Sequence, residues 1–267
     1  MLGIVQGLTE FLPISSTGHL RIVPAFLGWD DPGAAFTAVT QLGTMAAVLL
    51  YFRNDLIRIA LAWLRSLRDR QARRELDARI GWYIVLGTIP IGIFGVLFKD
   101  QIETGARDLY LIGTALIVLG LVLLLAERVG TRTRTLEQIE ARDGLTVGLA
   151  QALALVPGVS RSGATITAGL FLGLDRPTAA RFSFLLSVPA VVLSGLFELG
   201  SILSGEEGEH VSTGNLIIAT VLAFVAGYAS IAWLLRYLST HSTVVFVVYR
   251  VALGALVLVL ASAGAIK

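Results

Sequence analysis

Six apolar stretches, each long enough to cross a lipid bilayer as a helix, constrain this chain more than any other feature of its sequence. They cover about residues 34–52, 81–98, 109–126, 179–200, 214–236 and 244–264. A spanning helix needs roughly 20 mostly apolar residues. Only 15% of all residues are charged, well below the usual share in soluble domains. The sequence therefore predicts an all-α polytopic membrane protein.

Two further apolar stretches, about 1–29 and 145–175, are interrupted by residues that break helices. The interruptions read P-I-S-S-T-G from Pro13 and P-G-V-S-R-S-G from Pro157. Each stretch is too long for one short core helix and too broken for one continuous span. We therefore expect two re-entrant hairpins, each made of two short helices that meet at a polar turn. Such a turn is tolerated at membrane depth where protein or a wet cavity surrounds it.

The arginines of the loops predict the orientation of the chain. Residues 53–80 hold eight arginines and residues 127–143 hold four, whereas the 201–213 loop has neither lysine nor arginine and carries three glutamates. Basic loops remain in the cytoplasm. We therefore expect 53–80 and 127–143 inside, and 201–213 outside together with both termini.

Shifting the chain by 145 residues aligns the two broken stretches without a gap. Between Gly3 and Ala35, 12 of 33 positions are then identical, including Gln6 with Gln151 and Ser15 with Ser160. Each copy is one hairpin followed by three spans. Because three is an odd number, the second copy enters the membrane from the side opposite to the first. The sequence therefore predicts one membrane domain built as an inverted repeat, with repeat 1 at about 1–130 and repeat 2 at about 145–267.

Ionisable residues at membrane depth are costly, so those in the broken stretches are candidates for a functional site. They are Glu10, His19 and Arg161, whereas Arg21 is expected at the membrane interface. Both polar turns lead into a helix N-terminus, which attracts anions. We therefore predict a buried phosphate or diphosphate site with Arg161 as its main cation. Further candidates for phosphate binding are Ser15, Thr17, Ser160, Ser162, Thr165 and the intramembrane Arg250.

Ser16 and His19 lie three residues apart on one helix face, which favours a serine nucleophile with the imidazole as its base. Direct attack by His19, and attack by water that His19 or Glu10 assists, are the alternatives. His19 could also be a packing residue. The serine and threonine hydroxyls could instead bond only to backbone, as they often do in membrane helices.

Glu10 is a carboxylate in a site that otherwise suits anions. Its expected use is to hold a divalent cation or to handle protons, and Gln6 lies four residues earlier on the same face. Few protein ligands and several waters suit Mg²⁺, with Ca²⁺ as the alternative. The predicted metal ligands are therefore Glu10 and Gln6.

Residues 6–19 (QGLTEFLPISSTGH) and 157–165 (PGVSRSGAT) resemble the two signature motifs of the undecaprenyl-diphosphate phosphatases, also called the bacitracin-resistance family. The resemblance covers essentially the whole chain. It implies a metal-dependent enzyme of the bacterial cytoplasmic membrane, with its active site facing outside. It also implies that Gln6, Glu10, Ser16, His19 and Arg161 form this site. The chain departs from the pattern at Gln6, where the family often has glutamate.

The implied reaction is hydrolysis of undecaprenyl diphosphate to undecaprenyl phosphate and inorganic phosphate, which recycles a lipid carrier for cell-wall synthesis. The expected partners are a polyisoprenyl diphosphate lipid and the bilayer, with no nucleic acid and with a homodimer as a further possibility. A transporter or flippase of lipid phosphates is the rival function, because broken helices in inverted repeats are also typical of transporters. A transporter would need Arg161 but no nucleophile.

Overall fold

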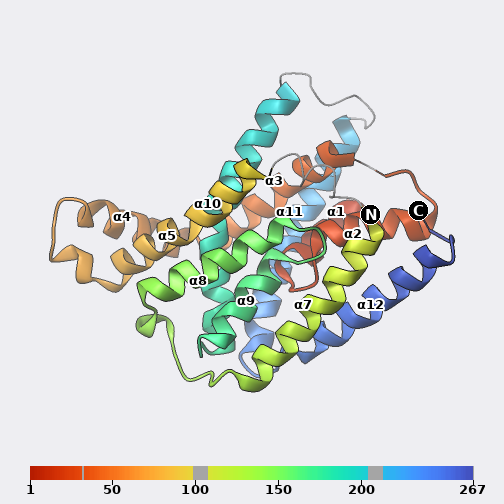
Figure 1. Cartoon of the computed structure of the whole chain (residues 1–267). Helices are drawn as coiled ribbons and strands as arrows, with labels where there is room; N and C mark the ends of the chain where they lie inside the picture. The colour runs from red at the N-terminus through yellow and green to blue at the C-terminus, as the bar shows by residue number, and fades with distance from the viewer. Residues whose placement is uncertain (32, 99–107, 204–212, 267) are drawn as a thin grey trace.

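The chain is all-helical in the residues that the computed structural model describes, which are 1–31, 33–98, 108–203 and 213–266 (Figure 1). The α-helices there are α1 (Leu2–Phe11), α2 (Ser16–Leu27), α3 (Gly33–Tyr51), α4 (Arg53–Ser66), α5 (Leu76–Leu97), α7 (Leu109–Val129), α8 (Ala141–Ala152), α9 (Arg161–Phe171), α10 (Arg176–Leu203), α11 (Thr213–Leu238) and α12 (Val244–Ser262). Short 3-10 helices lie at Ala72–Arg74, Leu136–Gln138 and Leu153–Leu155. The predicted all-α class is confirmed.

Within the described residues, four helices are long and apolar enough to cross a membrane by length and composition. They are α5, α7, α12 and residues 214–238 of α11, and they match four of the six predicted spans. The other two predicted spans fall on α3 and α10. The chain is a multi-pass membrane protein.

The outward faces of these helices carry the apolar side chains that a lipid-facing surface requires. Leu121 and Leu125 of α7 are about half exposed, and Val248 and Val259 of α12 are each 62% exposed. Contiguous apolar surface of this kind would be a liability in water. In a bilayer it faces lipid tails that are equally apolar.

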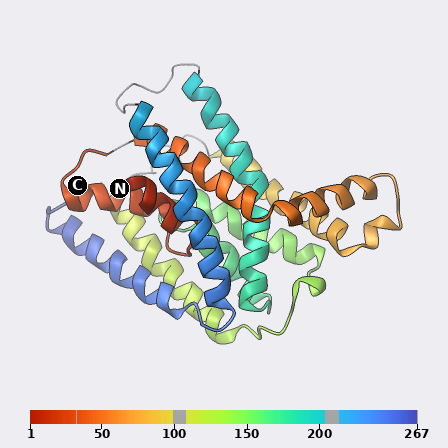
Figure 2. The same ribbon diagram turned by 180° about the vertical axis from the view of Figure 1, so that it is seen from behind.

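Glycines bring the two broken segments close to longer helices. Helix α1 packs against α11 and α3, whereas α8 packs against α5. A Cβ atom added at Gly3 would lie 2.1 Å from the carbonyl oxygen of Ala219, and one added at Gly148 would lie 2.3 Å from that of Gly87. Small residues at membrane helix interfaces allow this approach of backbones. The segments α1–α2 and α8–α9 therefore meet in the interior of the bundle (Figures 1 and 2).

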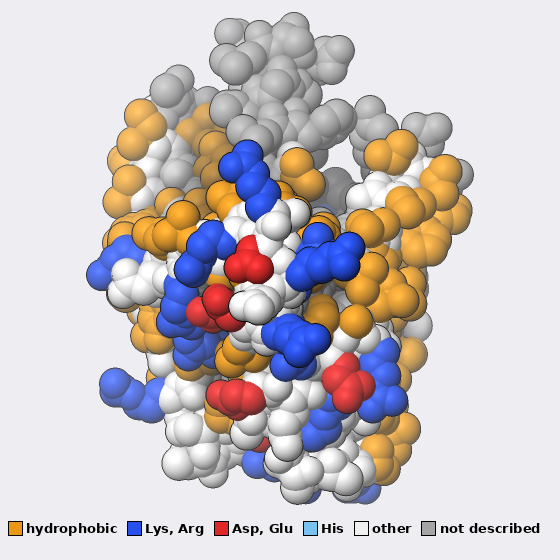
Figure 3. All heavy atoms as spheres, turned by 90° about the vertical axis from the view of Figure 1, so that its left-hand side faces the viewer, with side chains coloured by type: hydrophobic (Ala, Val, Ile, Leu, Met, Phe, Trp, Pro, Cys, Tyr) orange, Lys and Arg blue, Asp and Glu red, His pale blue; other side chains and the backbone are white. Residues whose placement is uncertain are grey.

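Basic side chains gather at the end of the molecule that α4 and the start of α5 form (Figure 3). The exposed arginines of this segment are Arg53, Arg58, Arg65, Arg68, Arg70, Arg73 and Arg74. Ser66, in contrast, is buried, and its hydroxyl accepts a hydrogen bond from Trp82. Residues 204–212, which include the acidic Glu206, Glu207 and Glu209, lie outside the described residues.

Candidate active site

The two broken segments turn in the same way at matching serines. Ser15 has a φ of 74° and Ser160 a φ of 72°, a region that residues other than glycine rarely adopt. Each serine is the N-cap of the following helix. The Ser15 hydroxyl accepts a hydrogen bond from the Gly18 amide at 3.4 Å, and the Ser160 hydroxyl accepts one from the Gly163 amide at 3.1 Å. Both α2 and α9 thus begin at a capped polar turn, with the positive end of the helix dipole there.

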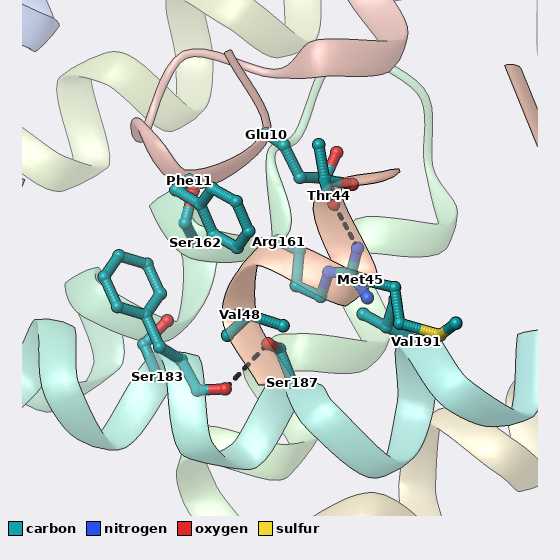
Figure 4. Close-up of a pocket in the computed structure, with 11 residues that line it drawn as sticks. Glu10, Phe11, Thr44, Met45, Val48, Arg161, Ser162, Ser183, Ser187 and Val191 are labelled. Atoms are coloured by element: carbon teal, nitrogen blue, oxygen red, sulfur yellow. Dashed lines mark hydrogen bonds and ion pairs between the residues drawn. The ribbon is translucent and has the colours of Figure 1, made fainter. Parts of the chain in front are cut away.

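Two contacts from the start of α9 reach the end of α1. The Ser162 hydroxyl donates to the carbonyl oxygen of Leu12 at 2.9 Å. The Arg161 guanidinium forms an ion pair with the Glu10 carboxylate (Figure 4). The structure therefore brings together the two motifs that lie about 150 residues apart in the sequence.

Glu10 is the centre of this cluster. One carboxylate oxygen, Oε1, accepts from Arg161, and the other accepts from Ser16 Oγ at 2.5 Å and from Gln6 Nε2 at 3.2 Å. The Glu10 side chain is 8% exposed and that of Arg161 is 19% exposed. A charge this deeply buried needs partners, and here it has three.

A small cavity of about 10 Å³ lies beside the ion pair, which is room for roughly one water molecule. Its walls include Thr44 of α3 with Ser183, Ser187 and Val191 of α10 (Figure 4). A bound phosphate would therefore have to displace side chains or separate Arg161 from Glu10.

The spacing of Ser16 and His19 had predicted that the imidazole would bond to the serine hydroxyl. In the structure the two side chains have other partners. The ring of His19 is buried, with Nδ1 placed 2.6 Å from the Ser15 carbonyl oxygen and Nε2 placed 2.6 Å from the Tyr249 hydroxyl. Because a carbonyl only accepts, Nδ1 carries a proton, and in the neutral ring Nε2 then accepts from Tyr249. Ser16 instead donates to Glu10, so the carboxylate is the base within its reach.

Most of the hydroxyls predicted to bind phosphate are engaged inside the protein. Ser15 and Ser160 cap helices, and Ser162 bonds to Leu12. Thr165 is fully buried and lies 2.5 Å from the hydroxyl of Ser183. Among the predicted hydroxyls, Ser16 is half-buried and Thr17 is exposed. These two are the hydroxyls that the structure leaves most accessible.

Arg250, which was also predicted to bind phosphate, is fully buried in α12. Its guanidinium donates to backbone carbonyl oxygens of the two turns and of α7. Arg161 is therefore the arginine that the structure places at the exposed side of the cluster.

The chain matches the family described as bacitracin resistance protein BacA over residues 1–256. It belongs to the BacA family. Undecaprenyl-diphosphatase 3 of Frankia alni is 58% identical to this BacA chain over 282 residues, covering 100% of the chain and 95% of the relative. An undecaprenyl-diphosphatase of a Nocardioides species is 57% identical, with 100% and 96% covered, and undecaprenyl-diphosphatase 2 of Streptomyces coelicolor is 53% identical, with 100% and 95% covered.

The sequence had not indicated the roles of Tyr249 and Ser183 in this BacA site. Tyr249 orients His19, and the two rings stack with their centroids 5.6 Å apart. Ser183 lines the cavity and lies against Thr165. Tyr249 stood out by its position next to an arginine within an apolar stretch and by the family resemblance at Tyr249 and Arg250, whereas a single serine in α10 gave no signal.

The residues around Glu10 offer oxygen ligands that fit a divalent cation. Gln6 Oε1 is buried and has no hydrogen-bond partner within the described residues. Together with the Glu10 carboxylate it provides the hard oxygen donors that Mg²⁺ and Ca²⁺ take. No group of three or more His, Cys, Asp or Glu close enough to hold a metal occurs in the described part of the chain. A cation here would therefore keep several waters.

Proposed function

We propose that this chain hydrolyses undecaprenyl diphosphate to undecaprenyl phosphate and inorganic phosphate. The observation that carries the proposal is the contact of Glu10 with both Ser16 and Arg161, which brings a carboxylate from the end of α1 to a hydroxyl and a guanidinium at the starts of α2 and α9. The names of the BacA relatives support the choice of substrate. Such a reaction would recycle the lipid carrier of cell-wall synthesis.

In the proposed mechanism, Ser16 Oγ attacks the terminal phosphorus while its proton passes to Glu10. The bond from this phosphorus to the bridging oxygen breaks, and undecaprenyl phosphate leaves with that oxygen. Water then hydrolyses the phosphoserine and releases inorganic phosphate. Once protonated, Glu10 no longer holds Arg161 by charge, so the guanidinium becomes available to the phosphoryl oxygens.

His19 serves in this mechanism as a positioning group, because its two ring nitrogens are engaged by Ser15 and Tyr249. Its bond to the Ser15 carbonyl steadies the turn from which Ser16 follows. Attack by His19 would require this imidazole to leave both partners. Attack by water with Glu10 as base uses the same carboxylate, and the behaviour of Ser16→Ala separates it from attack by serine.

Phosphate release in detergent, without any membrane gradient, is the direct test of this function. Purified protein with undecaprenyl diphosphate should release one phosphate per lipid over many turnovers. A transporter or flippase would move lipid in vesicles but release no phosphate in detergent. Well-folded protein that binds the lipid and leaves the diphosphate intact would refute the hydrolase.

We further propose that a divalent cation, Mg²⁺ or Ca²⁺, is held by Glu10 and Gln6. The cation would neutralise charge on the diphosphate when bound. Chelation should abolish most activity, and addition of Mg²⁺ should restore it. Gln6→Glu should stay active and require less Mg²⁺, since its added charge favours a cation. Unchanged activity after thorough chelation would remove the metal from the mechanism.

We infer an inverted repeat from the matching geometry of the two halves. Ser15 and Ser160 have nearly the same φ, and the hydroxyl of each caps the following helix. Each hydroxyl also contacts the hydroxyl of the residue two positions later, Thr17 at 3.3 Å and Ser162 at 3.2 Å. These correspondences support two re-entrant hairpins that enter from opposite sides. The basic end in Figure 3 would then face the cytoplasm, and the active site would open outward.

Accessible cysteines test this orientation, and the chain has no native cysteine to interfere. A cysteine at Asp30, which is exposed, should react with an impermeant thiol reagent added to intact cells. A cysteine at the exposed Arg70 should react only after the cells are opened. Ser66 would be a poor probe because it is buried. The reverse labelling pattern would invert the topology.

We propose that the isoprenoid chain of the substrate lies in an apolar groove of about 730 Å³ between α5, α7 and α8. Only apolar residues line it, and they include Phe94, Leu111 and Leu149. Val156 and Pro157 also line it, and they precede Arg161 by five and four residues in the sequence. This closeness in sequence supports a substrate whose apolar chain lies in the groove while its diphosphate reaches the proposed site.

Filling this groove should discriminate between lipids by length. Leu149→Trp should raise KM for undecaprenyl diphosphate about tenfold, as expected for lost apolar contact, and should leave KM for a soluble short-chain isoprenyl diphosphate unchanged. Leu125→Trp, on an exposed part of α7 outside the groove, is the matched control. Equal effects on long and short substrates would place the chain elsewhere.

A further inference from the structure

We propose that Arg250 is a positioning residue that holds the two polar turns together so that Glu10, Ser16 and Arg161 meet. The inference rests on the proposed hydrolase. Arg250 lies in α12, far from both motifs in sequence, and its side chain is 0% exposed. A charge buried this completely is retained where it has a definite task.

The guanidinium bonds to five backbone carbonyl oxygens from three separate parts of the chain. Nη1 donates to Pro13 at 3.1 Å, Nε to Leu116 at 3.2 Å, and Nη2 to Ala115, Gly158 and Val159 at 3.3, 3.2 and 3.0 Å. These acceptors come from the first turn, from the second turn and from the middle of α7. One side chain thus joins both turns to a spanning helix.

The carbonyls of the two turns are the groups that most need such a donor. Regular helix pairs its own backbone, but a polar turn in the membrane interior leaves carbonyls without a helical partner. A buried polar group without a hydrogen bond is costly. Arg250 supplies Pro13 in one turn and Gly158 and Val159 in the other with donors from a single planar group.

The bonded carbonyls stand next to the residues of the proposed reaction. Pro13 lies three residues before Ser16, and Val159 lies two residues before Arg161. The guanidinium therefore fixes the separation between the two backbone segments that carry the nucleophile and the cation. A misplacement of about 1 Å in such an arrangement can lower a rate about a hundredfold.

Arginine suits this task better than lysine does. A guanidinium presents five N–H donors in a rigid fork, whereas an ammonium presents three from one nitrogen. All three nitrogens of Arg250 donate to carbonyls, and no carboxylate contacts the group within the described residues. The side chain thus acts through backbone geometry, and contact with the phosphate falls to Arg161.

Arg250→Lys, measured with undecaprenyl diphosphate in detergent, tests this role. We expect kcat to fall about ten- to a hundredfold while KM stays within about threefold, because the phosphate ligands remain but are misplaced. Arg176→Lys is the matched control. Arg176 pairs with the buried Glu127, which also accepts from Thr243, so the change disturbs a buried ion pair and should leave kcat unchanged.

Spin labels give a readout that does not depend on turnover. Labels on cysteines at Thr17 and Val156, both exposed, report the distance between the two turns. The distance distribution should broaden in Arg250→Lys and stay narrow in Arg176→Lys. If Arg250→Lys fails to fold, Gly120→Ala replaces it, since the new methyl would lie 3.3 Å from Arg250 Cβ. Gly113→Ala, which meets Leu258 at 2.9 Å, is then its control.

The outcomes separate the inference from the function on which it rests. If the wild-type protein has no phosphatase activity, the proposed hydrolase function is refuted. The distances between the spin labels then still decide whether Arg250 holds the two turns together. An active wild type with unchanged kcat and unchanged distances in Arg250→Lys overturns the positioning role alone. A KM raised more than tenfold at constant kcat also overturns it, because that result would mean contact with the substrate.

Discussion

Arg161→Ala is expected to lower kcat/KM for undecaprenyl diphosphate by about a thousandfold or more while the protein stays folded. The guanidinium is the accessible cation of the cluster, with its side chain 19% exposed. Arginines that stabilise transferred phosphoryl groups contribute about 10³ to 10⁵ in rate. The measurement is phosphate release by purified variants whose melting temperatures in detergent have been compared.

The loss has to be separated from the effect of leaving Glu10 without its partner. A buried carboxylate that loses its cation destabilises the fold, so the double variant Arg161→Ala with Glu10→Gln is measured beside the single one. We expect the double variant to be more stable than Arg161→Ala and to remain inactive. Arg128→Ala, at an exposed position at the end of α7, should behave like wild type. Near-normal turnover in folded Arg161→Ala would refute the site.

Ser16→Ala is expected to reduce kcat about a thousandfold or more if Ser16 is the nucleophile. Its hydroxyl donates to Glu10 at 2.5 Å, so a base is already in contact with the proton that must leave. If Ser16 only bonds to phosphate, one hydrogen bond of about 1.5–3 kcal/mol is lost and the decrease is about tenfold to a hundredfold. The size of the effect therefore distinguishes the two roles.

Ser15→Ala is the neighbouring comparison for this result. It removes an N-cap hydroxyl and should lower stability by about 1 kcal/mol, with a much smaller effect on kcat. Denaturation of wild type during turnover should also trap a phosphate ester on Ser16, which mass spectrometry would locate. A loss below a hundredfold in Ser16→Ala, together with an unmodified Ser16, would leave water activated by Glu10 as the attacking group.

Hydropathy predicted α5, α7, α11 and α12 because each is a long apolar run, and the breaks at Pro13 and Pro157 predicted where helices end. The structure gives Ser16 and His19 different partners, for a reason that spacing cannot reveal. Ser16 is the first residue of α2 and faces the end of α1, whereas His19 faces Tyr249 of α12. Residues three apart share a helix face, but the residues they meet depend on which segments pack there.

Arg250 shows the same limit. The sequence marked it as an intramembrane charge, which is correct, and suggested phosphate as its partner. Every residue has a backbone carbonyl, so the sequence does not mark the ones that need a side-chain donor. An arginine that bonds to backbone therefore looks the same in the sequence as an arginine that binds a ligand. The contact of Glu10 with Arg161 likewise depends on how the two polar turns pack against each other. The sequence similarity of the two broken stretches was the indication that these turns meet.

The ion pair between Glu10 and Arg161 has a consequence for product release. The product of the proposed reaction stays in the same membrane as the substrate, so an open cationic site would soon be occupied by lipid monophosphate. A resident carboxylate competes for the guanidinium at every turnover, and it regains its charge when its proton departs. Arg161 then pairs again with the Glu10 carboxylate instead of with the lipid phosphate. In the proposed reaction this exchange would weaken inhibition by accumulated product, at the expense of some affinity for the substrate.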